Sequence, residues 1–444
     1  MKFLTHPAGL MCAVWAAAIT LFYVSPISYV HSPGIVAWTI ILGGIALFCS
    51  GALVGGRRKS LNASATQDPS LDNLVVVCAA LGFIGIAAMT FDKLYLSDID
   101  WSQGLSAARD KRANEVMENI GIRRSWLLYF GYLTFSFSCV AITIFMLAGE
   151  RLRTFASICG QASVLPMTIY AVLYGGRMPI LLVILLFVGA SITRVARGRT
   201  LVPADRWLWW KFAFVAVAFL AYTNQVWQTR RDMNRMSTYP TFLAVAASRW
   251  EMQPTPLLDS AIRNGTVPAN LAMDWLSIDM YLTHPPTTVQ RMVEHWREFS
   301  IYGGLYQIGI LSPISDIVAP SLKLPQTMRT ELSAIGAYGW FPSAWGAWIG
   351  DAGLIGGAFC VFVWGLLSGF CYRQTLERSS LSAALMLTFA YLGILVSPLN
   401  GPFGFANSFL IFLSFAATYA WLSWRNRAIR KSDAISCSAR TSNS

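Results

Sequence analysis

The sequence predicts an all-α protein that crosses a membrane many times. Of its 444 residues, 55% are apolar and only 13% are charged, whereas a soluble protein carries about 25% charged residues. Apolar runs of about 20 residues, the length that a helix needs to cross a hydrocarbon core of about 30 Å, recur along the chain. We therefore expect about ten transmembrane helices and one large helical loop outside the membrane.

Each expected span is an apolar run long enough to cross the bilayer. The ten spans lie at 8–29, 34–54, 74–95, 125–148, 155–175, 178–193, 207–224, 344–371, 381–397 and 408–424. The first begins like a signal peptide, but it is too long for one and a second span follows directly, so it is expected to stay as a helix. The expected organisation is seven helices in 1–224, an external loop over 225–343, three helices in 344–424 and a cytoplasmic tail over 425–444.

The distribution of charge predicts the orientation. With the N-terminus inside, the cytoplasmic segments carry 17 lysines and arginines against six acidic residues. The external loops at 225–343 and 96–124 balance, at nine against nine and five against five. The net charge of +12 is therefore a positive-inside signature with both termini in the cytoplasm, and it needs no nucleic-acid partner. The external loops contain no cysteine, so no disulfide framework is expected there.

The large loop shows helical periodicity in two places. Apolar residues of 268–282 share one face, namely Leu271, Trp275, Ile278 and Leu282. Those of 287–300 do the same, namely Val289, Met292, Val293, Trp296 and Phe299. Amphipathic helices need an apolar surface to lie on, here the membrane interface or the ends of the bundle. We expect a compact external lid; the alternative is a packed cap without an active role.

Arginines gather at the expected external surface. Arg177 lies in "YGGRMP", an outward-facing turn in which the positive-inside rule disfavours a cation. Arg230, Arg231, Arg235 and Arg249 follow the outward end of the seventh span. The planar guanidinium suits phosphate oxygens, so the group predicts a binding site for a lipid diphosphate. The alternatives are ion pairs with nearby acids and, for Arg177, an arginine reaching ordinary lipid phosphates.

Few residues can act as acid or base. His295, on the second amphipathic segment, is the best candidate for a general base, with Glu331 and Asp351 as carboxylate alternatives. Asp351 is expected about one turn inside the membrane, where an ionisable residue indicates function. Around it, Gly346, Gly350, Gly353 and Gly357 predict a flat face for close helix packing. The four histidines show no metal-ligand spacing, and nucleotide-binding motifs are missing, so neither a metal, a cofactor nor ATP is expected.

Layout and motifs together resemble the Wzy-type polymerases of bacterial surface polysaccharides. The resemblance rests on ten or more spans, one dominant late external loop, "GGRMPILL" at 175–182 and "GAYGWFPSAWGAWIGDAGLIGGAF" at 336–359. It implies a GT-C-like fold in the bacterial inner membrane, with the active face in the periplasm. The implied donor is a polyprenyl-diphosphate-linked oligosaccharide, which is joined to another lipid-linked repeat unit. The resemblance also raises a polysaccharide chain-length regulator as a partner.

The same resemblance implies roles for the candidate residues. Arg177, with Arg231, Arg235 or Arg249, would neutralise the diphosphate leaving group, and His295 would activate the acceptor hydroxyl. Two alternatives stay open: an O-antigen ligase, which uses the same donor but transfers to lipid A core, and a transporter or flippase for a lipid-linked glycan. The scarcity of charge at the expected midplane and the absence of a repeated half favour an enzyme over a transporter.

Overall fold

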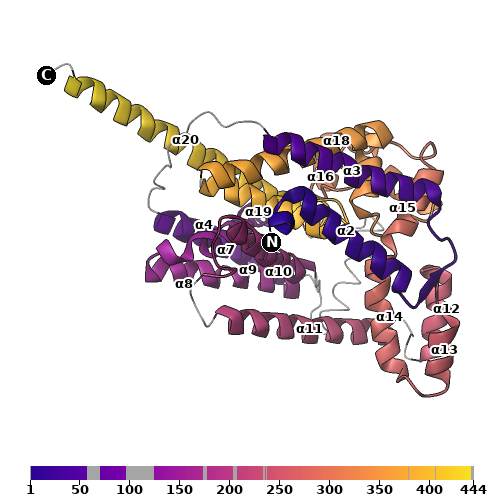
Figure 1. Cartoon of the computed structure of the whole chain (residues 1–444). Coiled ribbons are helices and arrows are strands. Elements are labelled where there is room, and N and C mark those ends of the chain that lie inside the picture. The colour runs from indigo at the N-terminus through magenta and orange to yellow at the C-terminus, as the bar shows by residue number, and fades with distance from the viewer. Residues whose placement is uncertain are drawn as a thin grey trace.

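Helices make up nearly all of the computed structural model (Figure 1). It describes residues 2–57, 71–96, 125–173, 178–203, 208–233, 236, 238–378, 380–405 and 407–441. Seven described helical stretches are long and apolar enough to cross a membrane: Pro7–Val24, Ile35–Arg57, Leu71–Leu96, Trp126–Arg151, Thr154–Leu173, Met178–Ala196 and Ser343–Glu377. The chain is a multi-pass membrane protein.

Seven spans by this measure are fewer than the ten expected from the sequence. The shorter apolar helix α19 (Leu381–Val396) coincides with the expected ninth span. Helices α11 (Leu208–Met233) and α20 (Ser408–Thr441) cover the expected seventh and tenth. Helix α20 runs far past its apolar part, into residues that were expected to form a cytoplasmic tail (Figure 1).

The apolar helices pack into two neighbouring clusters. One cluster joins α4 (Leu71–Phe91), α6 (Trp126–Phe135), α7 (Phe137–Ala148), α9 (Val164–Leu173), α10 (Met178–Ala196), α19 and α20. The other joins α2 (Pro7–Val24), α3 (Ile35–Arg57), α18 (Ser343–Arg378) and α19, with Val289 of the external region at its end. Because α19 contributes to both clusters, it links the two halves of the bundle.

Helices α3 and α18 approach each other at backbone distance. A Cβ at Gly51 or Gly55 would overlap the carbonyl oxygens of Phe362 or Leu366 on α18. Gly365 and Gly369 of α18 face α3 in the same way. Each pair is four residues apart, the small-xxx-small spacing that allows such contact. The close packing therefore lies in the inner half of α18, not at the glycines expected to provide it.

Helix α18 is broken at Gly353, where φ is 68° and ψ is 179°. This backbone conformation is essentially restricted to glycine. The expectation of one continuous glycine face from Gly346 to Gly357 is therefore wrong. Gly346 lies against Pro342 and against Met292 of the short helix α15, and Gly350 lies against Met292, Tyr302 and Tyr306.

The large loop is helical, as expected. It contains α12 (Tyr239–Arg249), α13 (Pro256–Arg263), α14 (Ala269–Thr283), α15 (Pro285–Glu294), α16 (Leu311–Val318) and α17 (Leu324–Ala334). The remaining helical elements are short. They are the four-residue helix α1 (Lys2–Thr5), a π-helical turn at Asp92–Leu96, helix α8 (Thr154–Ala162), and 3₁₀ turns at Gly149–Arg151 and, within the large loop, at Pro320–Leu322.

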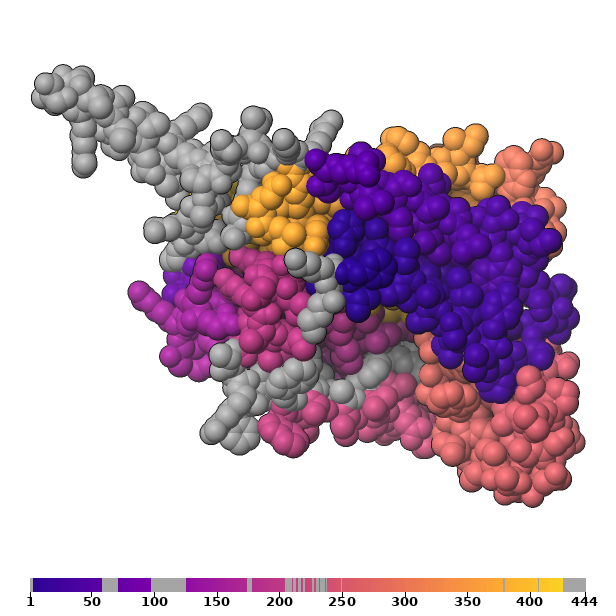
Figure 2. Space-filling view, in the orientation of Figure 1, coloured from indigo at the N-terminus to yellow at the C-terminus, as the bar shows by residue number. Residues whose placement is uncertain are grey.

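A small two-stranded sheet ties this region to the start of the chain. Strand β1 (Ile27–Tyr29), between α2 and α3, pairs antiparallel with β2 (Met252–Pro254). Figure 2 shows the external helices as a mass directly against the N-terminal helices. Helix α14 contributes Met273, Leu276 and Met280 to the core of this mass. The large loop is thus fixed to the end of the bundle at which α2 and α3 are connected.

The apolar face predicted for α14 is exposed within the chain. Leu271, Trp275, Ile278 and Leu282 are 62%, 57%, 48% and 41% exposed. The helix lies across the direction of the spans (Figure 1), which is the orientation of an interfacial helix. This face suits the membrane interface.

Candidate functional site: a loop bound to a broken membrane helix

The candidate site lies where the segment after α15 meets the break in α18. In an unbroken helix, the carbonyls of Gly350 and Asp351 would accept hydrogen bonds from residues four further on. Here Tyr302 N donates to Gly350 O at 3.0 Å and Gly303 N to Asp351 O at 2.9 Å. The loop of 300–307 thus supplies donors to these two carbonyls at the break.

The Asp351 side chain completes this junction. Its Oδ1 accepts from Tyr306 N at 2.8 Å, and its Oδ2 accepts from Gln307 N at 3.0 Å. The carboxylate is 5% exposed. Gly303 and Gly304, with φ of 61° and 99°, give the loop the turn that brings these amides to the carboxylate. Both carboxylate oxygens of Asp351 therefore hold the loop, so Asp351 positions the loop. A direct catalytic role for Asp351 stays a prediction.

Glu331 holds the outer side of the same loop. On α17, it accepts hydrogen bonds from Ser300 N at 2.8 Å, Ser300 Oγ at 3.0 Å and Tyr302 Oη at 3.0 Å. Partial burial raises the pKa of this carboxyl, but the hydrogen bonds from Ser300 and Tyr302 outweigh it and leave the pKa below its usual value. An ionised carboxylate stabilised in this way is a poor proton acceptor.

His295 lies in the turn that begins the loop. The sequence predicts a helix over 287–300, but α15 ends at Glu294. The turn places His295 Nδ1 2.9 Å from Glu298 Oε1, with the two side chains 40% and 62% exposed. Nδ1 itself is buried and makes no hydrogen bond, so the contact with Glu298 is at ion-pair distance only. The part of His295 as a general base stays a prediction.

A buried histidine lies behind this turn. His284 is 3% exposed, and its ring stacks on Trp340 with centroids 4.2 Å apart. Burial, with a smaller contribution from the charge of Arg291, lowers the pKa of His284 to about 3. Tyr306 Oη donates to Trp340 O at 3.2 Å, so the same tyrosine contacts both Asp351 and this aromatic pair.

Arg291 of α15 joins the site to the small sheet. Its guanidinium binds Glu251, beside β2, and donates to Gly336 O at 2.7 Å. Glu251 also accepts from His31 Nδ1 at 2.7 Å, in the turn between α2 and α3. Arg291 is 13% exposed at the side chain, so the site contains a nearly buried cation that the sequence did not single out.

The structure describes one of the predicted arginine side chains. Arg231, near the end of α11, is 12% exposed, and its Nη1 lies 3.6 Å from Asp274 Oδ1 on α14. Arg177 and Arg235 lie outside the described residues, as do the side chains of Arg230 and Arg249. The diphosphate site that these arginines were expected to form stays a prediction.

Sequence reasoning missed the loop of 300–307, although its signals were visible. The glycine pair of "IYGGLYQ" predicts a turn with positive φ. The two prolines after His284 predict the start of α15, which begins at Pro285. Neither signal identifies the partner of the segment, because Tyr306 and Asp351 are 45 residues apart.

The chain matches no protein-family model, no curated protein and no solved structure. Among the described residues, no group of three or more histidines, cysteines, aspartates and glutamates could hold a metal ion. Any functional assignment therefore depends on the geometry of the loop and α18.

Proposed function

We propose that the protein is a membrane glycosyltransferase that polymerises lipid-linked oligosaccharide repeat units. A growing glycan leaves polyprenyl diphosphate and is joined to a sugar hydroxyl of a second lipid-linked unit. One observation carries the proposal: the loop that begins with the His295–Glu298 pair is bound by four hydrogen bonds to the break in a membrane-spanning helix. A candidate base is thereby held at the end of the bundle, where the sugar of a membrane-anchored substrate would lie.

The proposed reaction assigns each group a task. His295 accepts the proton of the acceptor hydroxyl as that oxygen bonds to the anomeric carbon. Glu298 orients the imidazole and stabilises its protonated form. The bond from the anomeric carbon to the diphosphate breaks, and the electron pair leaves with the diphosphate, whose charge is neutralised by the predicted group of arginines. The reaction needs no ATP because the diphosphate ester is already activated.

A transporter for a lipid-linked glycan is the second candidate. The broken helix α18 favours it, because discontinuous membrane helices commonly form the substrate sites of transporters. A ligase that uses lipid A core as acceptor shares the donor chemistry, and product analysis separates it from a polymerase.

Reconstitution tests the proposal. The purified chain is placed in liposomes with a polyprenyl-diphosphate repeat unit and no ATP, and products are sized by mass spectrometry. We expect a ladder spaced by whole repeat units. Transfer to added lipid A core without a ladder would identify a ligase, and movement of unchanged substrate to the opposite leaflet would identify a transporter; either result would overturn the proposal.

A further inference from the structure

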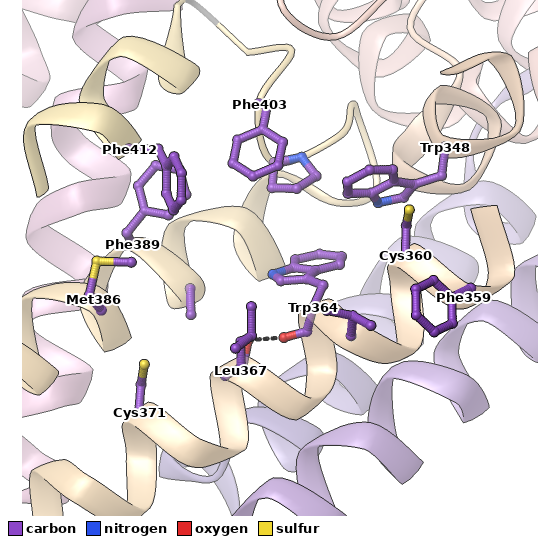
Figure 3. A pocket seen from close by; sticks show the side chains of 14 residues that line it. Trp348, Phe359, Cys360, Trp364, Leu367, Cys371, Met386, Phe389, Phe403 and Phe412 are labelled. Carbon is purple, nitrogen blue, oxygen red and sulfur yellow. Dashed lines mark hydrogen bonds between the residues drawn. The ribbon is translucent and has the colours of Figure 1, made fainter. Parts of the chain in front are cut away.

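An apolar groove runs along α18, mostly on the C-terminal side of the break. It has a volume of about 230 Å³ and lies between α18, α19, the segment at 402–403 and the start of α20. Rings of Trp348, Trp364, Phe389, Phe403 and Phe412 line it (Figure 3). None of the described lining residues is charged, so the groove fits a hydrocarbon chain and not a polar headgroup.

The groove is accessible from the side of the bundle that faces lipid. Two of its lining residues, Phe359 and Leu367, are 68% and 56% exposed. The stretch of α18 that contains them is a candidate membrane span. A chain embedded in the bilayer can therefore enter the groove without leaving the hydrocarbon phase.

The outer end of the groove adjoins the candidate site. Trp348, which lies three residues before Asp351 on α18, packs against Phe403 with ring centroids 6.1 Å apart. Pro402 lines the groove, and Gly401 precedes it in the chain. A Cβ at Gly401 would overlap Gln307 Oε1. Gln307 is the residue whose amide binds Asp351. The groove and the loop thus meet at Gly401.

Two buried polar atoms at this end have no hydrogen-bond partner: Gln307 Oε1 and Trp348 Nε1. Gln307 is 3% exposed. Buried polar groups normally have partners, and leaving one unpaired is destabilising. Trp348 Nε1 is a donor that can bind a phosphate oxygen, whereas Gln307 Oε1 is an acceptor and needs a donor such as a sugar hydroxyl. The pair therefore indicates an occupant that is apolar along its length and carries both kinds of polar group at that end.

We infer that the groove holds the isoprenoid chain of the lipid carrier, with its phosphate end toward the break in α18. The inference rests on the proposed function for the identity of the chain. Planar aromatic walls suit a branched, unsaturated chain, because its methyl groups and double bonds contact the ring faces closely. A carrier bound in this way would present its glycan to the loop that contains His295.

Photo-crosslinking tests the inference without requiring glycan transfer. The full chain in phospholipid nanodiscs is irradiated with polyprenyl phosphate that carries a diazirine on its chain, and the labelled residues are mapped by mass spectrometry. We expect labelling to concentrate on groove residues such as Cys360 and Met386. Val363→Trp, which fills the groove, should reduce this labelling at least five-fold. Val188→Trp, the same change at a position on α10 that is 40% exposed, should not.

Several outcomes would overturn the inference. One is equal labelling in wild type and Val363→Trp. Another is a preference for the second groove, of about 360 Å³, between α4 and α20.

Competition on the wild-type protein covers the case in which Val363→Trp fails to fold. Unlabelled polyprenyl phosphate must displace the probe, and an equal amount of phosphatidylglycerol must not. If the repeat-unit ladder forms but the groove is not labelled, the groove assignment fails while the proposed function stands.

Discussion

Asp351 shows how a single carboxylate can organise the site. Its two oxygens accept amide hydrogens of Tyr306 and Gln307, and its carbonyl accepts one from Gly303. A buried hydrogen bond to a charged acceptor contributes more than a neutral one, and an unsatisfied partner is destabilising. The position of the loop, and with it that of His295, therefore depends on this residue.

Asp351→Asn tests this dependence. The amide has one acceptor oxygen, so its NH₂ group must face one of the two backbone donors. We expect a loss of about 1.5–3 kcal/mol in the free energy of unfolding and faster protease cleavage within 295–307. Arg263→Gln is the control, because its ion pair with Asp259 is 66% exposed at the arginine and should contribute less than about 1 kcal/mol. Equal effects of the two changes would contradict the assignment.

His284 makes stability depend on pH. Its pKa of about 3 lies below the ordinary value of 6.5, so between these values the unfolded chain binds the proton more readily than the folded chain does. Its contribution to stability is therefore complete above pH 6.5 and decreases as pH falls toward 3. In thermal unfolding, the advantage of wild type over His284→Gln should shrink between pH 7 and pH 4.5. Thr288→Val keeps the imidazole and should retain the steep pH dependence of the wild type. A pH-independent difference between wild type and His284→Gln would refute this account.

At the scale of elements, the contact between α3 and α18 stabilises the cluster that α2, α3, α18 and α19 form. Gly51 and Gly55 on one helix face the backbone of the other, which in turn presents Gly365 and Gly369. Close approach of this kind gives many small dispersion contacts, which are the main attraction between helices in lipid. Helix α18 also contains the break that binds the loop. The contact with α3 therefore fixes the position of the candidate site along the axis of the bundle.

Gly51→Val tests the contact, with Gly43→Val as a control on the same helix. The first change would push a side chain into the Phe362 carbonyl, whereas a Cβ at Gly43 has no neighbour within 4 Å. We expect Gly51→Val to lower the free energy of unfolding by about 2–3 kcal/mol and Gly43→Val to change it by less than about 0.5 kcal/mol. Thermal unfolding in detergent measures both. Similar melting temperatures for the two variants would show that the helices do not need this approach.

The sequence predicted the elements more fully than their contacts. Bilayer thickness determines how long an apolar run must be, which is why the expected span 344–371 lies within α18, and 381–397 differs from α19 by one residue. Four glycines at helical spacing are compatible both with a smooth face and with a break. The amides of Tyr302 and Gly303, which bind the carbonyls of Gly350 and Asp351, stabilise the break at Gly353, and they come from a distant part of the chain.

The candidate site could be predicted only in part for the same reason. His295 and Asp351 could be identified from their residue types. The apolar face of α14 could be identified from the helical spacing of its apolar residues. The pairing of His295 with Glu298 depends on α15 ending at Glu294, and the burial of His284 depends on Trp340, 56 residues further along the chain. Tertiary contacts of this kind leave no local pattern in the sequence.

At the scale of the whole molecule, the N-terminal helices, the external helices and α18 converge on one end of the bundle. Strand β1 pairs with β2, Arg291 links α15 to Glu251, and Asp351 holds the loop. Each segment restricts the movement of the next. Under the proposed function, this end faces a lipid-linked substrate, and the broken helix sets the position of the proposed base relative to the membrane.

The rate of ladder formation in the reconstituted system, for variants of two matched histidines, tests the central claim most directly. His295 and His31 are both exposed and both have a glutamate oxygen close to Nδ1, at 2.9 Å and 2.7 Å, although only the His31 contact is a hydrogen bond. His295→Gln should lower the rate by about 10²–10⁴-fold, the contribution of a general base, while His31→Gln should leave it within about three-fold. A His295→Gln protein that folds and polymerises at the wild-type rate would contradict the account.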